Sequence, residues 1–304
     1  MEPRRGVALV GAPSNIGIKP YEDGQPRGLD RAPAVLRDHG LVARIGALDA
    51  GDVPAPPYED LVRPAHGVRN ERALVAYNRA LADRVAAAGA DGRFLVLVGG
   101  DCSIVLGAVL AARRLVGAAV GLAYIDGHAD FAMPEESATG SAASMCLAMV
   151  AGRGDTDLAR LSANGPLVAS RDLVLLGRRD DGEPYGHDGL RALHVRDIPY
   201  AEICARGRDV VVAETRAVLE REELGGFWVH VDADVLDASV MPAVDSPTSG
   251  GPDVDELVEL VSPLVGHPRA LGLQLTIYDP ALDGDRTCAE RLVQFLERTL
   301  SARS

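Results

Sequence analysis

The sequence lacks a dense cysteine framework. Its four cysteines form no CxxC pair, so we expect no disulfides and a reducing compartment. Long apolar runs are absent too: none approaches the roughly 20 residues that a membrane span needs. The apolar run near the N-terminus is too short for a signal peptide. We therefore expect a cytoplasmic protein with no membrane partner. The cysteines are Cys102, Cys146, Cys204 and Cys288.

Aromatic residues and positive charge are also scarce. Aromatics make up 4% of the chain, so leucine, valine and alanine must fill the core. The formal net charge of −13 argues against a nucleic acid or an anionic membrane as partner, and we interpret it as a solvated acidic surface. The 304 residues contain no linker, repeat or low-complexity block. We therefore predict a single domain spanning residues 1–304.

Short apolar runs alternate with helical stretches along the whole chain. Such runs are typical of buried strands, and apolar residues at helical spacing indicate helices. Pro54, Pro56 and Pro57 lead us to expect no regular structure over 46–57. The alternation predicts an α/β fold with a mostly parallel sheet covered on both faces. The expected strands lie near 7–11, 94–98, 122–125, 173–176, 227–231 and 271–277, and the clearest helices over 70–88, 208–219 and 253–265.

The stretch GLAYIDGHADF at 121–131 contains the first candidate metal ligands. Its apolar run stops at Asp126, and Asp126, His128 and Asp130 then occupy every second position. Alternate side chains of an extended backbone point to one face, so these three would converge. Two carboxylates and an imidazole form a ligand set for a divalent metal. The alternative is a strand-end turn whose histidine is satisfied by neighbouring polar groups.

A similar pattern recurs at two other strand ends. His230, Asp232 and Asp234 alternate in GFWVHVDAD at 226–234, and Cys102 follows a strand in FLVLVGGDCS at 94–103. Ligands of open α/β sheets bind at the carboxyl ends of strands, so these ends suggest one shared site. Two alternatives stay open. Cys102 is either a ligand or a small buried hydrophobe, and His230 either lines the pocket or is a core histidine bonded to a carboxylate.

These motifs resemble those of a known family. GGDxS, DGHAD and DAD look like the three metal motifs of the ureohydrolases, the family of arginase, agmatinase and formiminoglutamase. The match runs through nearly the whole chain, and the motifs occur in the family's order. The segments that carry it are 11–17 and 24–37 near the N-terminus, the motifs at 99–103, 126–130 and 232–234, and the later segments 235–251 and 271–280.

The resemblance implies a three-layer α/β/α fold and two manganese ions. In that family the ions share a hydroxide that attacks a guanidinium or amidine carbon. By position, Asp126 and Asp232 would bridge the ions. Asp130 would complete one site together with Cys102. The other site would be completed by His128 and Asp234.

Three positions depart from the arginase pattern. Cys102 stands where arginases have a histidine ligand, Ala143 where they have a histidine proton shuttle, and Ile277 where they have a substrate-binding glutamate. A thiolate is softer and favours zinc or iron, so one ion, or zinc, is an alternative to two manganese ions. The motifs GGDCS and YIDGHADF also resemble a smaller branch of the family that has a cysteine at this position. That branch includes the N-hydroxy-arginine amidinohydrolase of cycloserine biosynthesis. Because a guanidinium binds most strongly to a carboxylate partner, the missing glutamate argues against arginine as the substrate.

The resemblance also suggests which residues contact the substrate. We expect contacts at Asn15 in the N-terminal loop, at Gln274, and at Asp180, whose loop borders the pocket in the family. The alternatives are that Asn15 only caps its turn and that Asp180 is a surface charge. With the shuttle histidine missing, leaving-group protonation falls to Asp130, His230 or water.

Our first hypothesis is therefore a metal-dependent hydrolase that cleaves a C–N bond of a small guanidino or amidine compound. A catalytically silent metal- or ligand-binding relative, and a mononuclear amidohydrolase, are the alternatives. We expect a small-molecule substrate. The resemblance further implies a homo-oligomer.

Overall fold

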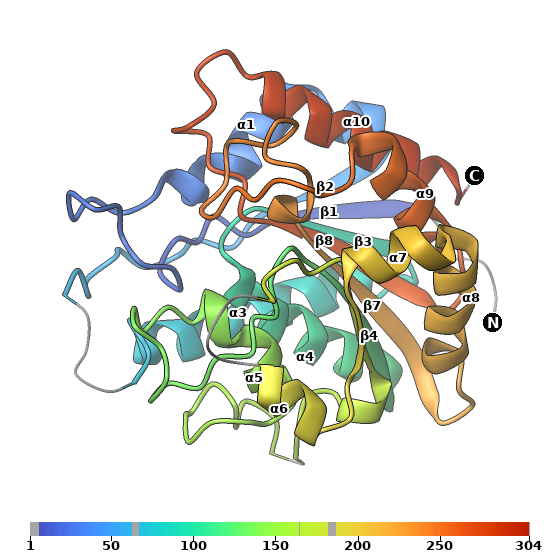
Figure 1. The fold of residues 1–304 in the computed structure, drawn as a ribbon. Coiled ribbons are helices and arrows are strands. Elements are labelled where there is room, and N and C mark those ends of the chain that lie inside the picture. The colour runs from blue at the N-terminus through green and yellow to red at the C-terminus, as the bar shows by residue number, and fades with distance from the viewer. Residues whose placement is uncertain (1–5, 63–66, 164, 182–186, 304) are drawn as a thin grey trace.

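The chain folds around one eight-stranded sheet, seen in a computed structural model that describes residues 6–62, 67–163, 165–181 and 187–303 (Figure 1). The strand order is β2-β1-β3-β8-β7-β4-β5-β6, and every neighbouring pair is parallel. This confirms the predicted α/β fold with a parallel sheet. The strands are β1 (Val7–Gly11), β2 (Ala47–Asp52), β3 (Phe94–Val98), β4 (Ala119–Ile125), β5 (Leu173–Leu176), β6 (Arg196–Ile198), β7 (Leu224–Asp232) and β8 (Ala270–Thr276).

Helices cover both faces of the sheet and complete the three layers (Figure 1). The helices α3 (Glu71–Gly89) and α4 (Val105–Val116) pack together on one face. On the other, α10 (Thr287–Ser301) packs against α1 (Ala32–Asp38) and α9 (Val254–Val265). None of the helices within the described ranges is long and apolar enough to cross a membrane. The others are α2 (Leu41–Arg44), α5 (Cys146–Val150), α6 (His187–Ala192), α7 (Tyr200–Arg206) and α8 (Arg208–Leu219).

The expectation of no regular structure over 46–57 was wrong in its first half. Residues 47–52 form β2, which lies at the edge of the sheet and pairs only with β1. An edge strand has one exposed side, so it needs no continuous apolar run, and every residue of β2 is partly buried or exposed. The prolines at 54, 56 and 57 follow the strand and end it.

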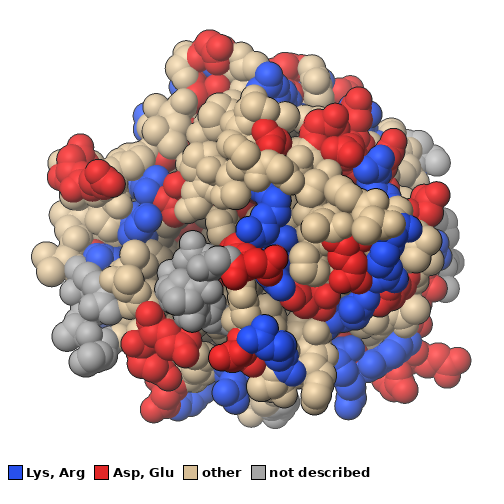
Figure 2. All heavy atoms as spheres, viewed as in Figure 1, with Lys and Arg blue, Asp and Glu red and all other residues tan. Residues whose placement is uncertain are grey.

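The visible surface carries both signs of charge. On the face drawn in Figure 2, acidic and basic side chains are interspersed. Many charged side chains of the described residues pair, as in the contacts of Arg206 with Glu202 and of Arg208 with Glu256. The excess of carboxylates therefore does not gather into one acidic surface on this face.

The single tryptophan, Trp228, packs against the strand next to its own. It is fully buried in β7, and its ring lies over Gly272 of the neighbouring strand β8. A Cβ added at Gly272 would meet this ring and would lie 2.7 Å from the backbone oxygen of Leu95. Glycine therefore lets the indole lie against this strand, where its N–H donates to Gln274 Oε1.

We expect Gly272→Ala to destabilise the protein by about 1–3 kcal/mol, the usual cost of overpacking a core. Urea unfolding followed by Trp228 fluorescence measures this directly, because no other tryptophan contributes. Gly284→Ala is the matched control, since no atom lies within 4 Å of the added Cβ there. Equal unfolding midpoints for the two variants would contradict the packing argument.

Candidate metal centre

Four neighbouring strands end at the same edge of the sheet. In the order β3-β8-β7-β4, their carboxyl ends bring together Cys102, Ile277, Asp232 and Asp126. The sequence motifs that lie far apart along the chain are therefore side by side in space. This edge is where parallel sheets bind their ligands.

Cys102 is placed by a tight turn after β3. Gly99 and Gly100 have φ values of +96° and +78°, in the left-handed region that favours glycine. The side chain of Asp101 accepts the backbone N–H of Ser103 at 3.0 Å and so starts the 3-10 turn that carries Cys102. The backbone N–H of Ile277 donates to the Gly100 carbonyl at 3.0 Å, which ties this turn to the end of β8.

Asp126, His128 and Asp234 form one cluster of potential ligand atoms, all within 4.8 Å of one another. The Nδ1 atom of His128 lies 3.0 Å from Asp234 Oδ2 and 3.7 Å from Asp126 Oδ1. The negative charge of Asp234 raises the pKa of His128 strongly. Burial opposes ionisation of Asp234, but the facing imidazolium outweighs it and lowers the pKa of that carboxyl. These groups thus already form a charge-paired set.

Asp126 also belongs to a second cluster, with Cys102, Asp232 and His230. The Cys102 thiol donates to Asp232 Oδ2 at 2.7 Å and lies 3.3 Å from the Thr276 hydroxyl. Burial raises the pKa of this thiol well above its usual value. Asp126 takes part in both clusters and therefore lies between the two sets of potential ligand atoms.

The donors present fit a divalent metal. Burial, reinforced by neighbouring carboxylates, raises the pKa of both Asp126 and Asp232 well above the usual range, so each carboxylate favours a nearby cation. Asp126 Oδ2 is buried and has no hydrogen-bond partner among the described residues. Such a set of carboxylates, one imidazole and one thiol is typical of transition-metal sites rather than of calcium sites.

His230 lies beneath the clusters, in a hydrogen-bonded chain that fixes its tautomer. The indole N–H of Trp228 donates to Gln274 Oε1 at 2.9 Å, and an indole can only donate. The amide nitrogen of Gln274 therefore faces His230 Nδ1, at 2.7 Å, and donates to it. In the neutral imidazole the proton must then sit on Nε2. The ring also stacks on Tyr124, with centroids 4.0 Å apart.

This tautomer leaves Nε2 of His230 without a free lone pair for a metal ion. Burial lowers its pKa to about 3, so the ring is neutral, and its Nε2 lies 4.0 Å from Asp126 Oδ2. A histidine that binds metal through one nitrogen normally donates a hydrogen bond from the other. Here the other nitrogen accepts one, so Nε2 keeps its proton. His230 therefore presents an N–H group toward Asp126 and not a lone pair.

Asp130 lies in the same cavity but in neither of the two clusters. Its φ of +46° takes the chain out of the extended conformation. The Tyr124 hydroxyl donates to Asp130 Oδ2 at 2.6 Å, and the Cys146 thiol lies 3.4 Å from the same oxygen. Burial is the main cause that raises the pKa of Asp130 to about 6. The structure thus brings Asp130 to the site, turned toward Tyr124.

The three expected substrate contacts occupy different places. Asp180 lines the cavity, where it accepts the backbone N–H of Ala129 at 2.8 Å. The Asn15 amide donates to the Arg27 carbonyl at 2.7 Å and closes its own loop. Gln274 is fully buried beneath His230. Neither Asn15 nor Gln274 is among the described residues that line the cavity.

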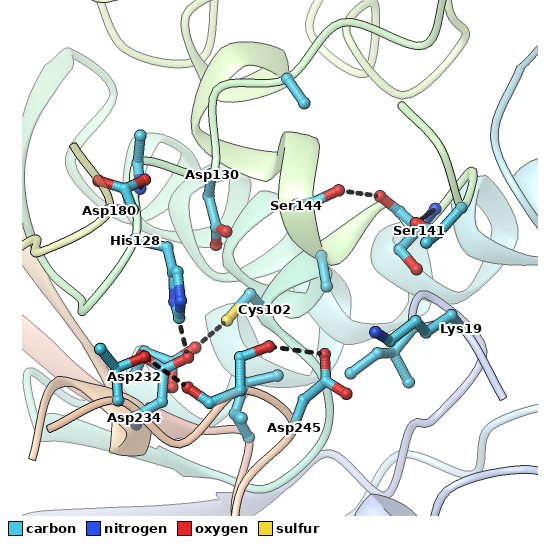
Figure 3. Close-up of a pocket in the computed structure, with 18 of the residues that line it drawn as sticks. Lys19, Cys102, His128, Asp130, Ser141, Ser144, Asp180, Asp232, Asp234 and Asp245 are labelled. Carbon is cyan, nitrogen blue, oxygen red and sulfur yellow. Dashed lines mark hydrogen bonds and ion pairs between the residues drawn. The ribbon is translucent and has the colours of Figure 1, made fainter. Parts of the chain in front are cut away.

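The cavity above the clusters measures about 400 Å³ (Figure 3). Ala143 and Ile277, which replace the family's shuttle histidine and glutamate by position, both line it. Lys19 and Asp245 also line it, and our sequence analysis missed both. One signal could have found Lys19: it is the only lysine in the chain. No comparable signal marks Asp245.

The family model described as "Arginase family" matches residues 5–300. An arginase of Staphylococcus aureus strain COL is 27% identical over 305 residues, with 97% of each chain covered. Human arginase-1 is 27% identical over 287 residues, covering 91% of this chain and 86% of its own. The native structure of Bacillus caldovelox arginase is 26% identical and superposes with a TM-score of 0.85, covering 97% of this chain and 98% of its own. The chain therefore belongs to the arginase family and is a hydrolase that acts on amidino C–N bonds.

Proposed function

We propose that the protein is a metal-dependent amidinohydrolase that cleaves a C–N bond of a small guanidino or amidine compound. One observation supports this most directly. The carboxylates of Asp126, Asp232 and Asp234 are buried side by side at the base of an open cavity. Grouped buried carboxylates are costly unless they hold a cation.

The chain's own residues divide into ligands and supports. Cys102, Asp126 and Asp232 would hold one divalent ion, and His128 and Asp234 would complete the other site. When bound, the ions would lower the pKa of a water molecule and orient it for attack on the amidino carbon. We expect manganese, with zinc as the alternative because of the thiol. Asp130, at the cavity wall, would accept a proton.

The remaining predicted residues take roles that follow from where they lie. Asp180 lines the cavity, and we keep it as a substrate contact. We propose that Asn15, Gln274 and His230 are positioning residues, since each acts through a hydrogen bond or a facing polar group. His230 would act on Asp126 only by facing its carboxylate with the Nε2 proton, since the two atoms are 4.0 Å apart and not hydrogen-bonded.

The substrate is expected to differ from arginine at its reacting end. Ile277 places an apolar side chain at the cavity wall where a guanidinium would need a carboxylate. A less basic amidino group, such as an N-hydroxylated guanidine, needs no such ion pair. We therefore propose a weakly basic amidino compound.

One observation favours a mononuclear hydrolase as the second candidate. Asp130 is hydrogen-bonded to Tyr124 and belongs to neither cluster. Without Asp130, the site around Cys102 has two carboxylates, those of Asp126 and Asp232, among the described residues. Metal stoichiometry separates the candidates: two ions per chain support the dinuclear enzyme, and one ion supports the mononuclear one.

Asp234→Asn should weaken metal binding by more than about tenfold, because even loss of an outer-shell partner has that effect. Wild-type protein should gain about 2.7 kcal/mol of stability at a manganese concentration 100 times the dissociation constant. Thermal unfolding with and without manganese measures both effects. Asp209→Asn is the control, since Asp209 is exposed on α8. If Asp234→Asn keeps the full manganese-dependent stabilisation, this ligand set is wrong.

Cys102→His should shift metal preference from zinc toward manganese, since it replaces a soft thiolate with an imidazole. Cys102→Ala should lose affinity for both metals. Elemental analysis after dialysis against equal concentrations of the two metals gives the ratio bound. An unchanged ratio in all three proteins would mean that Cys102 is a buried hydrophobe and not a ligand.

Gln274→Glu should invert the tautomer of His230. A carboxylate can only accept, so His230 would donate from Nδ1 and leave a lone pair on Nε2. Proton–nitrogen correlation NMR of the metal-free protein distinguishes the two tautomers. We expect Nε2–H in the wild type and in the exposed control Gln25→Glu, and Nδ1–H in Gln274→Glu. An Nδ1–H tautomer in the wild type would refute the assigned hydrogen-bond direction.

A further inference from the structure

Two cysteines from distant parts of the sequence meet beside the metal clusters. The 3-10 turn Cys102–Ile104 packs against the 3-10 turn Ala143–Met145, which leads directly into Cys146 at the start of α5. Both cysteines are buried, and both thiols are free. Burial is the main cause that raises the pKa of both thiols, and a hydrogen bond between the two side chains raises that of Cys102 further. The two sulfur atoms are therefore neighbours.

Cys146 has polar neighbours although it is fully buried. Its sulfur lies 2.9 Å from the Tyr124 hydroxyl and 3.1 Å from the Ala143 carbonyl oxygen. It also lies 3.4 Å from Asp130 Oδ2. A cysteine that serves as a small hydrophobe in a core needs no such partners. The Cys146 thiol therefore belongs to the same polar network as the candidate metal ligands.

The separations match those between ligands of one ion. Around a tetrahedral zinc ion, with bonds of about 2.0–2.3 Å, neighbouring ligand atoms are about 3.5 Å apart. The 3.4 Å between the Cys146 sulfur and Asp130 Oδ2 is close to that value. On its other side this sulfur meets the Cys102 thiol, which itself lies 2.7 Å from Asp232 Oδ2. Cys146 thus lies next to the cluster that contains Cys102, Asp126 and Asp232, although it is not a member of it.

We infer that Cys146 is a second thiolate ligand for the ion at the Cys102 position. This inference rests on the proposed function and deepens it. The Cys146 sulfur would exchange its contact with the Ala143 carbonyl for a bond to the ion, and both thiol protons would leave to solvent. Two thiolates and two carboxylates make four protein ligands, the number found in closed zinc sites. These ligands are Cys102, Cys146, Asp126 and Asp232.

The two metal positions would then prefer different ions. Paired thiolates select zinc over manganese, whereas carboxylates suit manganese. The cluster of Asp126, His128 and Asp234 contains no sulfur. The side chain of His128 is 26% exposed, while Cys102 is buried. The Cys102 position would therefore hold a structural ion, and the His128 position would keep the opening toward the cavity.

X-ray absorption spectroscopy of the wild-type protein tests the inference without any variant. The protein is kept under a reductant and loaded with one zinc ion per chain, which the position that contains the thiols should take first. We expect two sulfur neighbours at about 2.3 Å from the zinc ion. A single sulfur neighbour would overturn the second thiolate ligand.

Cobalt(II) substitution assigns the sulfur ligands to residues. The thiolate-to-cobalt charge-transfer absorption in the near ultraviolet rises with the number of bound thiolates. Cys146→Ser should remove about half of it and weaken zinc binding at least about 10- to 100-fold, because loss of an outer-shell partner already costs that much. Cys102→Ser should remove the same share of the absorption. Cys288→Ser is the matched control, since Cys288 is also buried and its backbone N–H donates to a carboxylate, that of Asp283, at 3.2 Å.

The outcomes separate this inference from the proposed function. Unchanged cobalt absorption in Cys146→Ser would overturn the inference and leave the proposed function standing, with Cys102 as the one thiolate ligand. Two bound thiolates without hydrolysis of any amidino compound would have the reverse meaning: the second ligand stands and the proposed catalytic function fails. If the wild type binds neither zinc nor cobalt, both are wrong.

Discussion

The burial of carboxylates at adjoining strand ends is the constraint on which the rest of this structure depends. Each carboxylate is held by a nearby backbone N–H: Asp126 accepts from His128 at 2.7 Å, Asp232 from Asp234 at 2.8 Å, and Asp234 from Gly127 at 3.2 Å. These bonds fix where the oxygens point but leave much of the negative charge uncompensated. The polypeptide thus builds the geometry of the site, and a bound cation is what would neutralise it.

A second layer of residues supports the site from within the sheet. Tyr124, His230 and Gln274 lie at matching register positions on β4, β7 and β8. The stack and the hydrogen bonds that join them run sideways across three strands, down to the buried Trp228. Because interiors are tightly packed, such a layer restricts movement of the aspartates above it. The edge of the sheet that carries the aspartates is therefore connected to the hydrophobic core by these contacts.

The sequence could predict the fold and the main cluster, because apolar runs and alternating polar residues are local patterns. It could not predict which strands are neighbours. Gln274 looked like a pocket residue, and only the pairing of β8 with β7 shows that its amide faces Trp228 and His230. Alternation could not show how Asp130 is oriented within the cavity, because β4 ends at Ile125 and the backbone beyond it turns into the left-handed region. Lys19 lies in a loop, where no periodicity applies.

The departures from the arginase pattern are concentrated around one cavity, which argues for a changed substrate and against general loss of the site. Ile277 is the clearest case. It has a φ of +67°, a conformation that costs a β-branched residue energy. The strained turn nevertheless joins the backbone at Gly100 and holds the loop that places Cys102. Under the proposed function, the backbone framework would serve the metal ligands, Cys102 among them, while Lys19, Ala143 and Ile277 would shape the cavity for a different small molecule.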